Sequence, residues 1–194
     1  LVALYYDCMS YRPEDPLWED RDRLIFSKGH GCYALYAILA DKGVLPREEW
    51  EGFYTEKSTL PGCIERKPEH GLEAGCGSLA HGLPIAVGIA FGAEIQKKKY
   101  NTFCVVGDGE LQEGSNWEAA MAAAHHKTDN LIAIVDRNGY QTGPTEQMMA
   151  LERVRAVHPR LHGPAPPSGG GRAYRPTTHH APRAPRLAAP RKDG

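Results

Sequence analysis

Three short polar segments each follow an apolar run, and their side chains could bind a metal ion. They are Ser-Lys-Gly-His at 27–30, Gly-Asp-Gly-Glu at 107–110 and Asp-Arg-Asn-Gly at 136–139. Asp108 offers a carboxylate and Asn138 an amide oxygen. Hard oxygen ligands of this kind suit Mg²⁺, which keeps some of its coordination sites for phosphate oxygens and water. These residue types therefore predict a magnesium site.

The glycines beside Asp108 indicate what the metal would accompany. Gly107 and Gly109 have no side chains, so phosphate oxygens can approach the backbone N–H groups. The N-terminus of a following helix favours an anion at the same place. The segment is therefore interpreted as a cradle for Mg²⁺ and a diphosphate, although Asp108 in this position could also simply cap the next helix.

The elements that must position these residues are predicted from apolar runs and helical periodicity. Buried strands are expected at 23–26 and 130–135 and a further strand at 102–106, with a helix at 113–126 between the last two strands. Strand, helix and strand in that order form a βαβ unit, which implies a parallel sheet whose ligand lies beyond the carboxyl ends of the strands. The expected fold is a three-layer α/β domain. Further helices are expected near 31–39, 46–56 and 82–97, with Trp117 and Met121 in the core.

Charge and composition exclude several classes of protein. The 194 residues contain 23 Lys and Arg against 24 Asp and Glu, so a uniformly basic nucleic-acid binder is excluded. The apolar runs are shorter than the roughly 20 residues that span a bilayer, and no signal peptide is visible. Five cysteines without a CxxC pair predict neither a disulfide framework nor a zinc site. A cytoplasmic protein that binds neither membrane nor nucleic acid is expected.

The average composition conceals two parts. Residues 1–152 are acidic, whereas residues 153–194 contain nine Lys and Arg, one acid and eight of the 15 prolines. A domain is expected over 1–152 and a disordered basic tail over 153–194. The tail could bind nucleic acid or an acidic partner through its charge, could be an inert linker, or could be translated out of frame, which its Arg/Pro/Ala/Gly/His composition favours. The chain begins at Leu1 within an apolar stretch, so a missing N-terminus is expected.

Four segments, in order along the chain, resemble motifs of the transketolase family. Residues 26–30 resemble its "SxGH" segment, 77–82 its "GPLGQG" segment and 107–114 its "GDGxxQEG" segment. Asn138, thirty residues after Asp108, completes a motif similar to that for thiamine diphosphate. The set covers roughly residues 1–150 and resembles the N-terminal, thiamine-diphosphate-binding part of a transketolase. In a split transketolase this part would be a separate small subunit.

This resemblance implies roles for particular residues. Asp108 and Asn138 would bind Mg²⁺ through their side chains, and Tyr140 through its backbone carbonyl. His30 and Gly109 would contact the diphosphate.

The remaining implied roles concern the organic part of the cofactor and the subunit interface. Gly77 and Leu79 would line the aminopyrimidine side, and Gly107 would belong to the cofactor site. Glu113 would join an acidic network between subunits, although a glutamate there could also only complement the helix dipole. His30 and Glu113 are thus the catalytic candidates.

The implied reaction moves a two-carbon ketol unit from a ketose phosphate to an aldose phosphate. In the family the glutamate that activates the aminopyrimidine lies in a second domain, so this chain is expected to need a complementary C-terminal domain or subunit, in a homo- or hetero-oligomer. Cys63 and His81 depart from the family's pattern and leave the donor sugar open. The alternatives are a relative of 1-deoxyxylulose-5-phosphate synthase and a non-catalytic interaction protein with a basic arm.

Overall fold

The structure, a computed structural model, describes residues 1–141 and 143–145. The chain divides into two units, Leu1–Val157 and His158–Gly194, and every described residue belongs to the first. The basic tail predicted at 153–194 lies outside the described residues. All that follows concerns the first unit.

Among the described residues, three parallel strands form the sheet, in the order β1-β2-β3. They are β1 (Arg23–Phe26), β2 (Thr102–Gly107) and β3 (Leu131–Asp136). Phe26 pairs with Val105 and Gly107 with Asp136, so all the strands end toward the same edge. The parallel sheet is confirmed, and each strand begins and ends within one residue of its predicted bounds.

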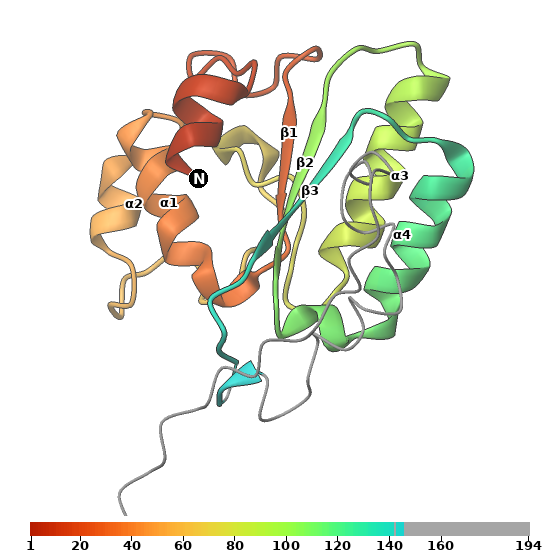
Figure 1. Ribbon diagram of the computed structural model, residues 1–194. Coiled ribbons are helices and arrows are strands. Elements are labelled where there is room, and N and C mark those ends of the chain that lie inside the picture. Colours follow the sequence, from red (N-terminus) through yellow and green to blue (C-terminus); the bar gives the residue numbers. More distant parts are fainter. Residues whose placement is uncertain (142, 146–194) are drawn as a thin grey trace, which may run out of the picture. The chain divides into compact units, whose positions relative to one another are not determined.

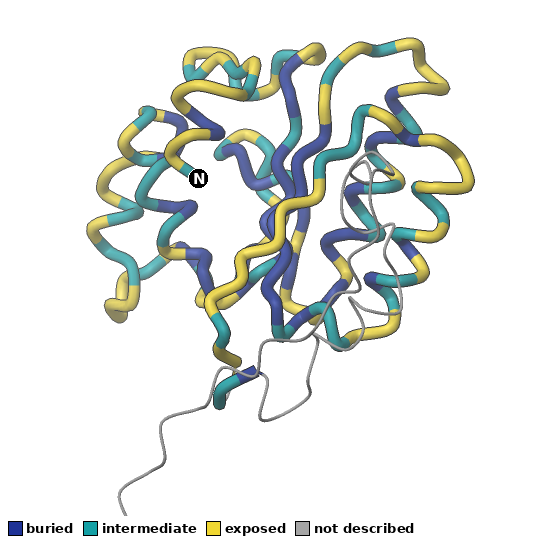
Figure 2. The backbone as a smooth tube through the Cα atoms, viewed as in Figure 1, coloured by how far each residue is buried: buried dark blue, intermediate teal, exposed yellow. Residues whose placement is uncertain are grey.

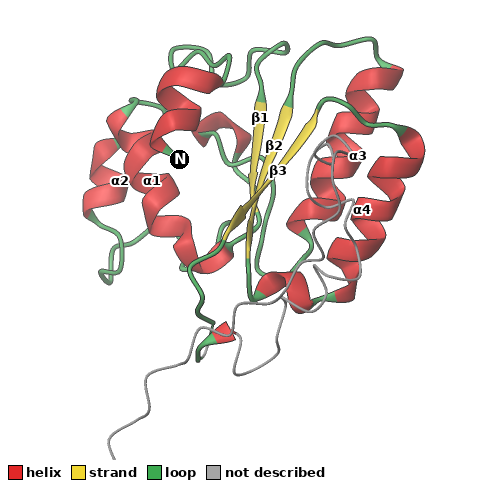
Figure 3. Ribbon diagram, in the orientation of Figure 1, coloured by secondary structure: helices red, strands yellow, loops and turns green. Residues whose placement is uncertain are grey.

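Helices cover both faces of this sheet. Figures 1 and 3 show α1 (Cys32–Asp41) and α2 (Arg47–Glu51) on one side and α3 (Gly82–Ile95) and α4 (Gly114–His126) on the other. The predicted three-layer α/β fold is therefore confirmed. None of the helices among the described residues has the length and apolarity needed to cross a membrane. Shorter helical turns lie at Leu4–Cys8, Gly29–Gly31, Pro68–His70 and Glu110–Gln112.

The core lies around the central strand. Every residue of β2 is buried, because strands on both sides and helices on both faces enclose it. On α3, Ala86, Ala90 and Ala93 have no exposed surface, since small side chains let this helix lie close to the sheet. Figure 2 shows β3, in contrast, as largely exposed.

Two expectations about burial were wrong. The apolar sequence of β3 predicted a buried strand, but residues 133–136 are exposed because β3 is the outermost strand of the described sheet. Met121 was expected in the core, but 66% of its surface is exposed. The face of α4 that packs inward carries Asn116 and Ala119, and a pattern of apolar residues alone could not identify a face that includes an asparagine.

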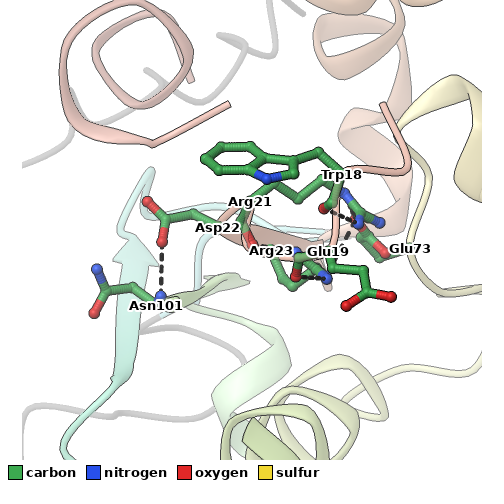
Figure 4. A network of polar contacts seen from close by, with 7 residues as sticks. All are labelled: Trp18, Glu19, Arg21, Asp22, Arg23, Glu73 and Asn101. Carbon is green, nitrogen blue, oxygen red and sulfur yellow. Dashed lines mark hydrogen bonds and ion pairs between the residues drawn. The ribbon is translucent and has the colours of Figure 1, made fainter. Parts of the chain in front are cut away.

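A buried ion pair anchors the chain at the end of the sheet opposite the carboxyl edge (Figure 4). Arg21 donates from Nε and Nη2 to Glu73 Oε1, at 3.1 and 2.7 Å, and from Nη1 to the Trp18 carbonyl. Close by, Asp22 Oδ1 accepts from the Asn101 N–H at 2.6 Å. These bonds fix the start of β1 relative to the loop at 71–81, which leads to the functional site.

Candidate functional site

The carboxylate of Asp108 lies where the ends of β2 and β3 meet. Its side chain is buried, and Oδ2 accepts a hydrogen bond from the Gly139 N–H at 2.9 Å. Oδ1 accepts from the Gly109 N–H at 3.0 Å, and the Asp108 N–H donates to the Asp136 carbonyl at 3.2 Å. The two segments that the sequence predicted to converge are therefore hydrogen-bonded to each other.

A tight turn after β3 carries the second predicted ligand. Asn138 is exposed, and its Oδ1 accepts from the Tyr140 N–H at 2.8 Å. Between them Gly139 has a φ of 76°, a left-handed conformation that glycine adopts without strain. The Asn138 amide and the Tyr140 carbonyl therefore lie on either side of Gly139, whose N–H donates to Asp108.

The oxygen donors at this edge fit Mg²⁺. One buried carboxylate, an exposed amide oxygen and a backbone carbonyl are the hard ligands that this ion prefers, and three protein ligands leave room for phosphate oxygens. No group of three or more His, Cys, Asp and Glu side chains that could hold a metal occurs among the described residues.

Gly109 is required for packing as well as for open space. A Cβ at this position would lie 2.8 Å from the Gln141 Cβ, closer than carbon atoms approach. At Gly107 the same test gives only ordinary contacts, of 3.7 Å or more. The sequence predicted that both glycines leave room for phosphate, whereas the structure shows that Gly109 also lets the 107–110 loop pack against the residue after the Asn138 turn.

The end of β1 brings His30 and a lysine to the same edge. His30 lies in the Gly29–Gly31 turn directly after the strand, and its side chain is exposed. Lys28 Nζ pairs with Asp136 Oδ2 at 2.5 Å, which ties this segment to the end of β3. Sequence reasoning gave Lys28 no role, because its partner is 108 residues away.

The loop carrying Gly77 and Leu79 lies against the end of β1. A Cβ at Gly29 would be 2.6 Å from the Cys76 carbonyl oxygen, and one at Gly82 would be 2.3 Å from Ser27 Cβ. Gly77 itself is exposed, with nothing within 4 Å of where a Cβ would lie, and Leu79 is 44% exposed. The loop is therefore held closely at both ends and open to a ligand between them.

Two further predicted residues lie at the surface. Glu113 is exposed and precedes α4, so it lies at the end of the helix where a negative charge complements the dipole, and its side chain makes no capping hydrogen bond. His81 precedes α3 and is also exposed without a capping bond.

Sequence reasoning missed Glu110, which is 4% exposed and whose carboxylate accepts hydrogen bonds from three separate segments. It stands next to the predicted Gly-Asp-Gly, but only its burial, which depends on distant loops, distinguishes it from a surface glutamate.

The negative charge of Glu110 also acts on neighbouring thiols. Burial first, then the charge of Glu110 and the nearby Cys63, raise the pKa of Cys76 to about 11. Burial and the same carboxylate also raise the pKa of Cys104.

These observations define the class: a parallel α/β domain whose acidic, amide and glycine residues gather at the carboxyl edge of the sheet. The family described as the thiamine diphosphate binding domain of transketolase matches residues 2–157. The chain therefore belongs to the transketolase family. The four motifs on which the resemblance rested lie on the β1, β2 and β3 ends and on the loop before α3.

Individual relatives agree with this assignment. An apulose-4-phosphate transketolase subunit of Phocaeicola vulgatus is 45% identical over 158 residues, which cover 80% of this chain and 55% of the relative. A 6-deoxy-6-sulfo-D-fructose transketolase subunit of a Clostridium species is 40% identical over 153 residues, covering 78% and 56%. The crystal structure of Campylobacter jejuni transketolase matches with a TM-score of 0.73 and 32% identity, over 82% of this chain and 26% of that one. The chain spans about half the length of these curated relatives.

Proposed function

We propose that this chain supplies the half of a transketolase active site that holds the diphosphate of thiamine diphosphate and its Mg²⁺ ion. The observation that carries the proposal is the 2.9 Å hydrogen bond from the Gly139 N–H to Asp108 Oδ2. It joins the Gly-Asp-Gly loop to the Asn138 turn, so that the donors the family's motif requires lie on adjacent loops. Asp108, Asn138 and the Tyr140 carbonyl would bind the metal.

The surrounding residues would hold the rest of the cofactor. His30 and Gly109 would contact the diphosphate, since both lie at the ends of strands whose carboxyl edge favours anions. Gly77 and Leu79, on the exposed part of their loop, would line the aminopyrimidine side. Thiamine diphosphate supplies the carbon nucleophile for breaking and forming the carbon–carbon bond, and this chain's residues bind and orient it.

A complementary subunit would complete the site. Two of the relatives described above are named as transketolase subunits, and their names support a split enzyme. The outer surface of α3 is suited to close contact with a partner, because Gly88 and Gly92 have nothing within 4 Å of a Cβ position and Ile95 is 68% exposed. Glu113, exposed at the start of α4, would face the same interface.

The substrates would be a ketose phosphate and an aldose phosphate. The test is a ketol-transfer assay with saturating cofactor and Mg²⁺, run with this chain alone, with a complementary subunit alone and with both. Turnover only in the mixture is expected, because the isolated chain would neither complete the acid–base machinery nor exclude water. A panel of ketose donors would identify the sugar. Turnover by this chain alone would refute the proposed division of the site.

A further inference from the structure

Glu110 is a buried carboxylate that binds three segments of the site at once. Oε1 accepts from the Ser27 hydroxyl and, at 3.0 Å, from the Ala80 N–H, while Oε2 accepts from the Gly107 N–H at 2.9 Å. Ser27 follows β1, Ala80 ends the Gly77–Leu79 loop and Gly107 ends β2. One side chain therefore contacts every segment of the proposed cofactor cradle except the Asn138 turn.

All three donors are neutral groups. Moving a carboxylate from water into a protein interior is unfavourable unless hydrogen bonds to its oxygens replace those of water. Hydrogen bonds from backbone N–H groups to a carboxylate are about twice as strong as bonds between neutral groups. The loops therefore stabilise the buried charge, and the charge in turn holds the loops together.

The backbone of Ala80 is strained where Glu110 holds it. Its φ is 63°, in the left-handed region that residues with a Cβ rarely adopt, and it has no exposed surface. Such a conformation persists only where surrounding contacts determine it. Here the N–H is bound by Glu110, and the carbonyl accepts from Ser115 Oγ at 3.2 Å. The exposed Gly77–Leu79 segment directly precedes this fixed point.

We infer that Glu110 is a positioning residue that holds the Gly77–Ala80 loop and the Gly107 backbone in the arrangement that receives thiamine diphosphate. This inference rests on the proposed function for the identity of the ligand. Because Glu110 is buried beneath the loops, it would act on the cofactor through them. Its contribution would be to keep the loops ordered before the cofactor arrives, so that binding requires less ordering.

Amide hydrogen exchange of this chain without cofactor tests the inference, with Glu110→Gln as the main variant. A glutamine has one accepting oxygen and one donating NH₂ group, so it can satisfy the Ala80 N–H or the Gly107 N–H but not both. At least one of these amides should then exchange about tenfold faster or more, because its protected state is lost locally. Ser27→Ala is the matched control, since it removes one partner of Glu110 but leaves both amides an acceptor.

Cofactor titration gives the second readout, made with the complementary subunit and Mg²⁺. Glu110→Gln should weaken thiamine diphosphate binding about tenfold, while turnover at saturating cofactor is retained, because a positioning residue acts on the population of the competent loop. Adding Ala80→Gly to Glu110→Gln should recover part of the affinity, since glycine adopts a positive φ unaided. Leu45→Ala, a buried change among residues that Glu110 does not contact, controls for lost stability.

Unchanged exchange at both amides in Glu110→Gln would overturn the inference. If that variant does not fold, exchange in the wild-type chain tests the inference instead. The Ala80 and Gly107 amides should then exchange at least about a hundredfold more slowly than the amide of exposed Leu79. Equal rates would overturn the inference. A wild-type complex that binds no thiamine diphosphate would overturn the proposed function instead. The exchange measurement, made without cofactor, would still show whether Glu110 holds the loops.

Discussion

At the scale of single residues, pairs of the same residue types should contribute differently to stability when their burial differs. Arg21 and Arg47 each pair with a glutamate, but the Arg21–Glu73 pair is 6% and 11% exposed while Arg47–Glu51 is 76% and 62% exposed. Arg21→Met should lower the free energy of unfolding by about 3 kcal/mol, because buried Glu73 loses both hydrogen bonds from Arg21 and keeps only Arg23, whose Nε lies 4.0 Å away. Arg47→Met should leave the urea midpoint nearly unchanged. Equal effects of the two substitutions would show that burial does not govern these pairs.

Thiol reactivity should also follow burial. Because the pKa of Cys76 is raised to about 11, its reactive thiolate forms only as the pH approaches that value. At pH 8 the thiolate fraction is on the order of 10⁻³. Iodoacetamide followed by peptide mass spectrometry should therefore find exposed Cys8 alkylated and Cys76 protected, with the protection lost as the pH rises toward 11. Alkylation of Cys76 as fast as Cys8 at pH 8 would contradict this environment.

At the scale of elements, helix α3 offers a test of how closely the loops must approach. Gly82→Ala should destabilise the domain by about 1–3 kcal/mol, since the new Cβ would lie 2.3 Å from Ser27 Cβ. Gly88→Ala on the same helix has open space around it and should stabilise the chain by about 0.5–1 kcal/mol, because alanine favours the helix. Thermal unfolding of both variants checks the contrast, and similar shifts would mean that the α3–β1 contact is not close.

Strands and helices were predicted well where an apolar run or a helical periodicity dominates the sequence. The apolar run at 102–106 predicted a strand, and the structure has β2 at Thr102–Gly107. The equally apolar β3 was predicted buried but is exposed, because burial depends on which strand lies at the edge, and a single strand's sequence does not carry that information. Asp108 and Asn138 were predicted as ligands from their residue types and spacing, and the loops that carry them are hydrogen-bonded to each other. Glu110 was not, because its role depends on Ser27 and Ala80, which are 83 and 30 residues away.

At the scale of the whole molecule, the described residues form a scaffold that brings four distant segments to one edge of a three-stranded sheet. The chain belongs to the transketolase family, and at this edge the Gly-Asp-Gly loop and the Asn138 turn are hydrogen-bonded while the β1 end is paired to β3 through Lys28 and Asp136. The central claim is therefore that this edge binds thiamine diphosphate through Mg²⁺, with Asp108 as the main metal ligand.

Calorimetric titration of thiamine diphosphate into the chain, assembled with its complementary subunit, tests that claim most directly. Binding should require Mg²⁺, disappear with a chelator and be lost in Asp108→Ala, because the diphosphate charge then lacks its bound counterion. Asp129→Ala, which removes an exposed carboxylate from the turn before β3, is the matched control and should bind like the wild type. Unchanged affinity in Asp108→Ala, or binding that does not depend on Mg²⁺, would contradict the account.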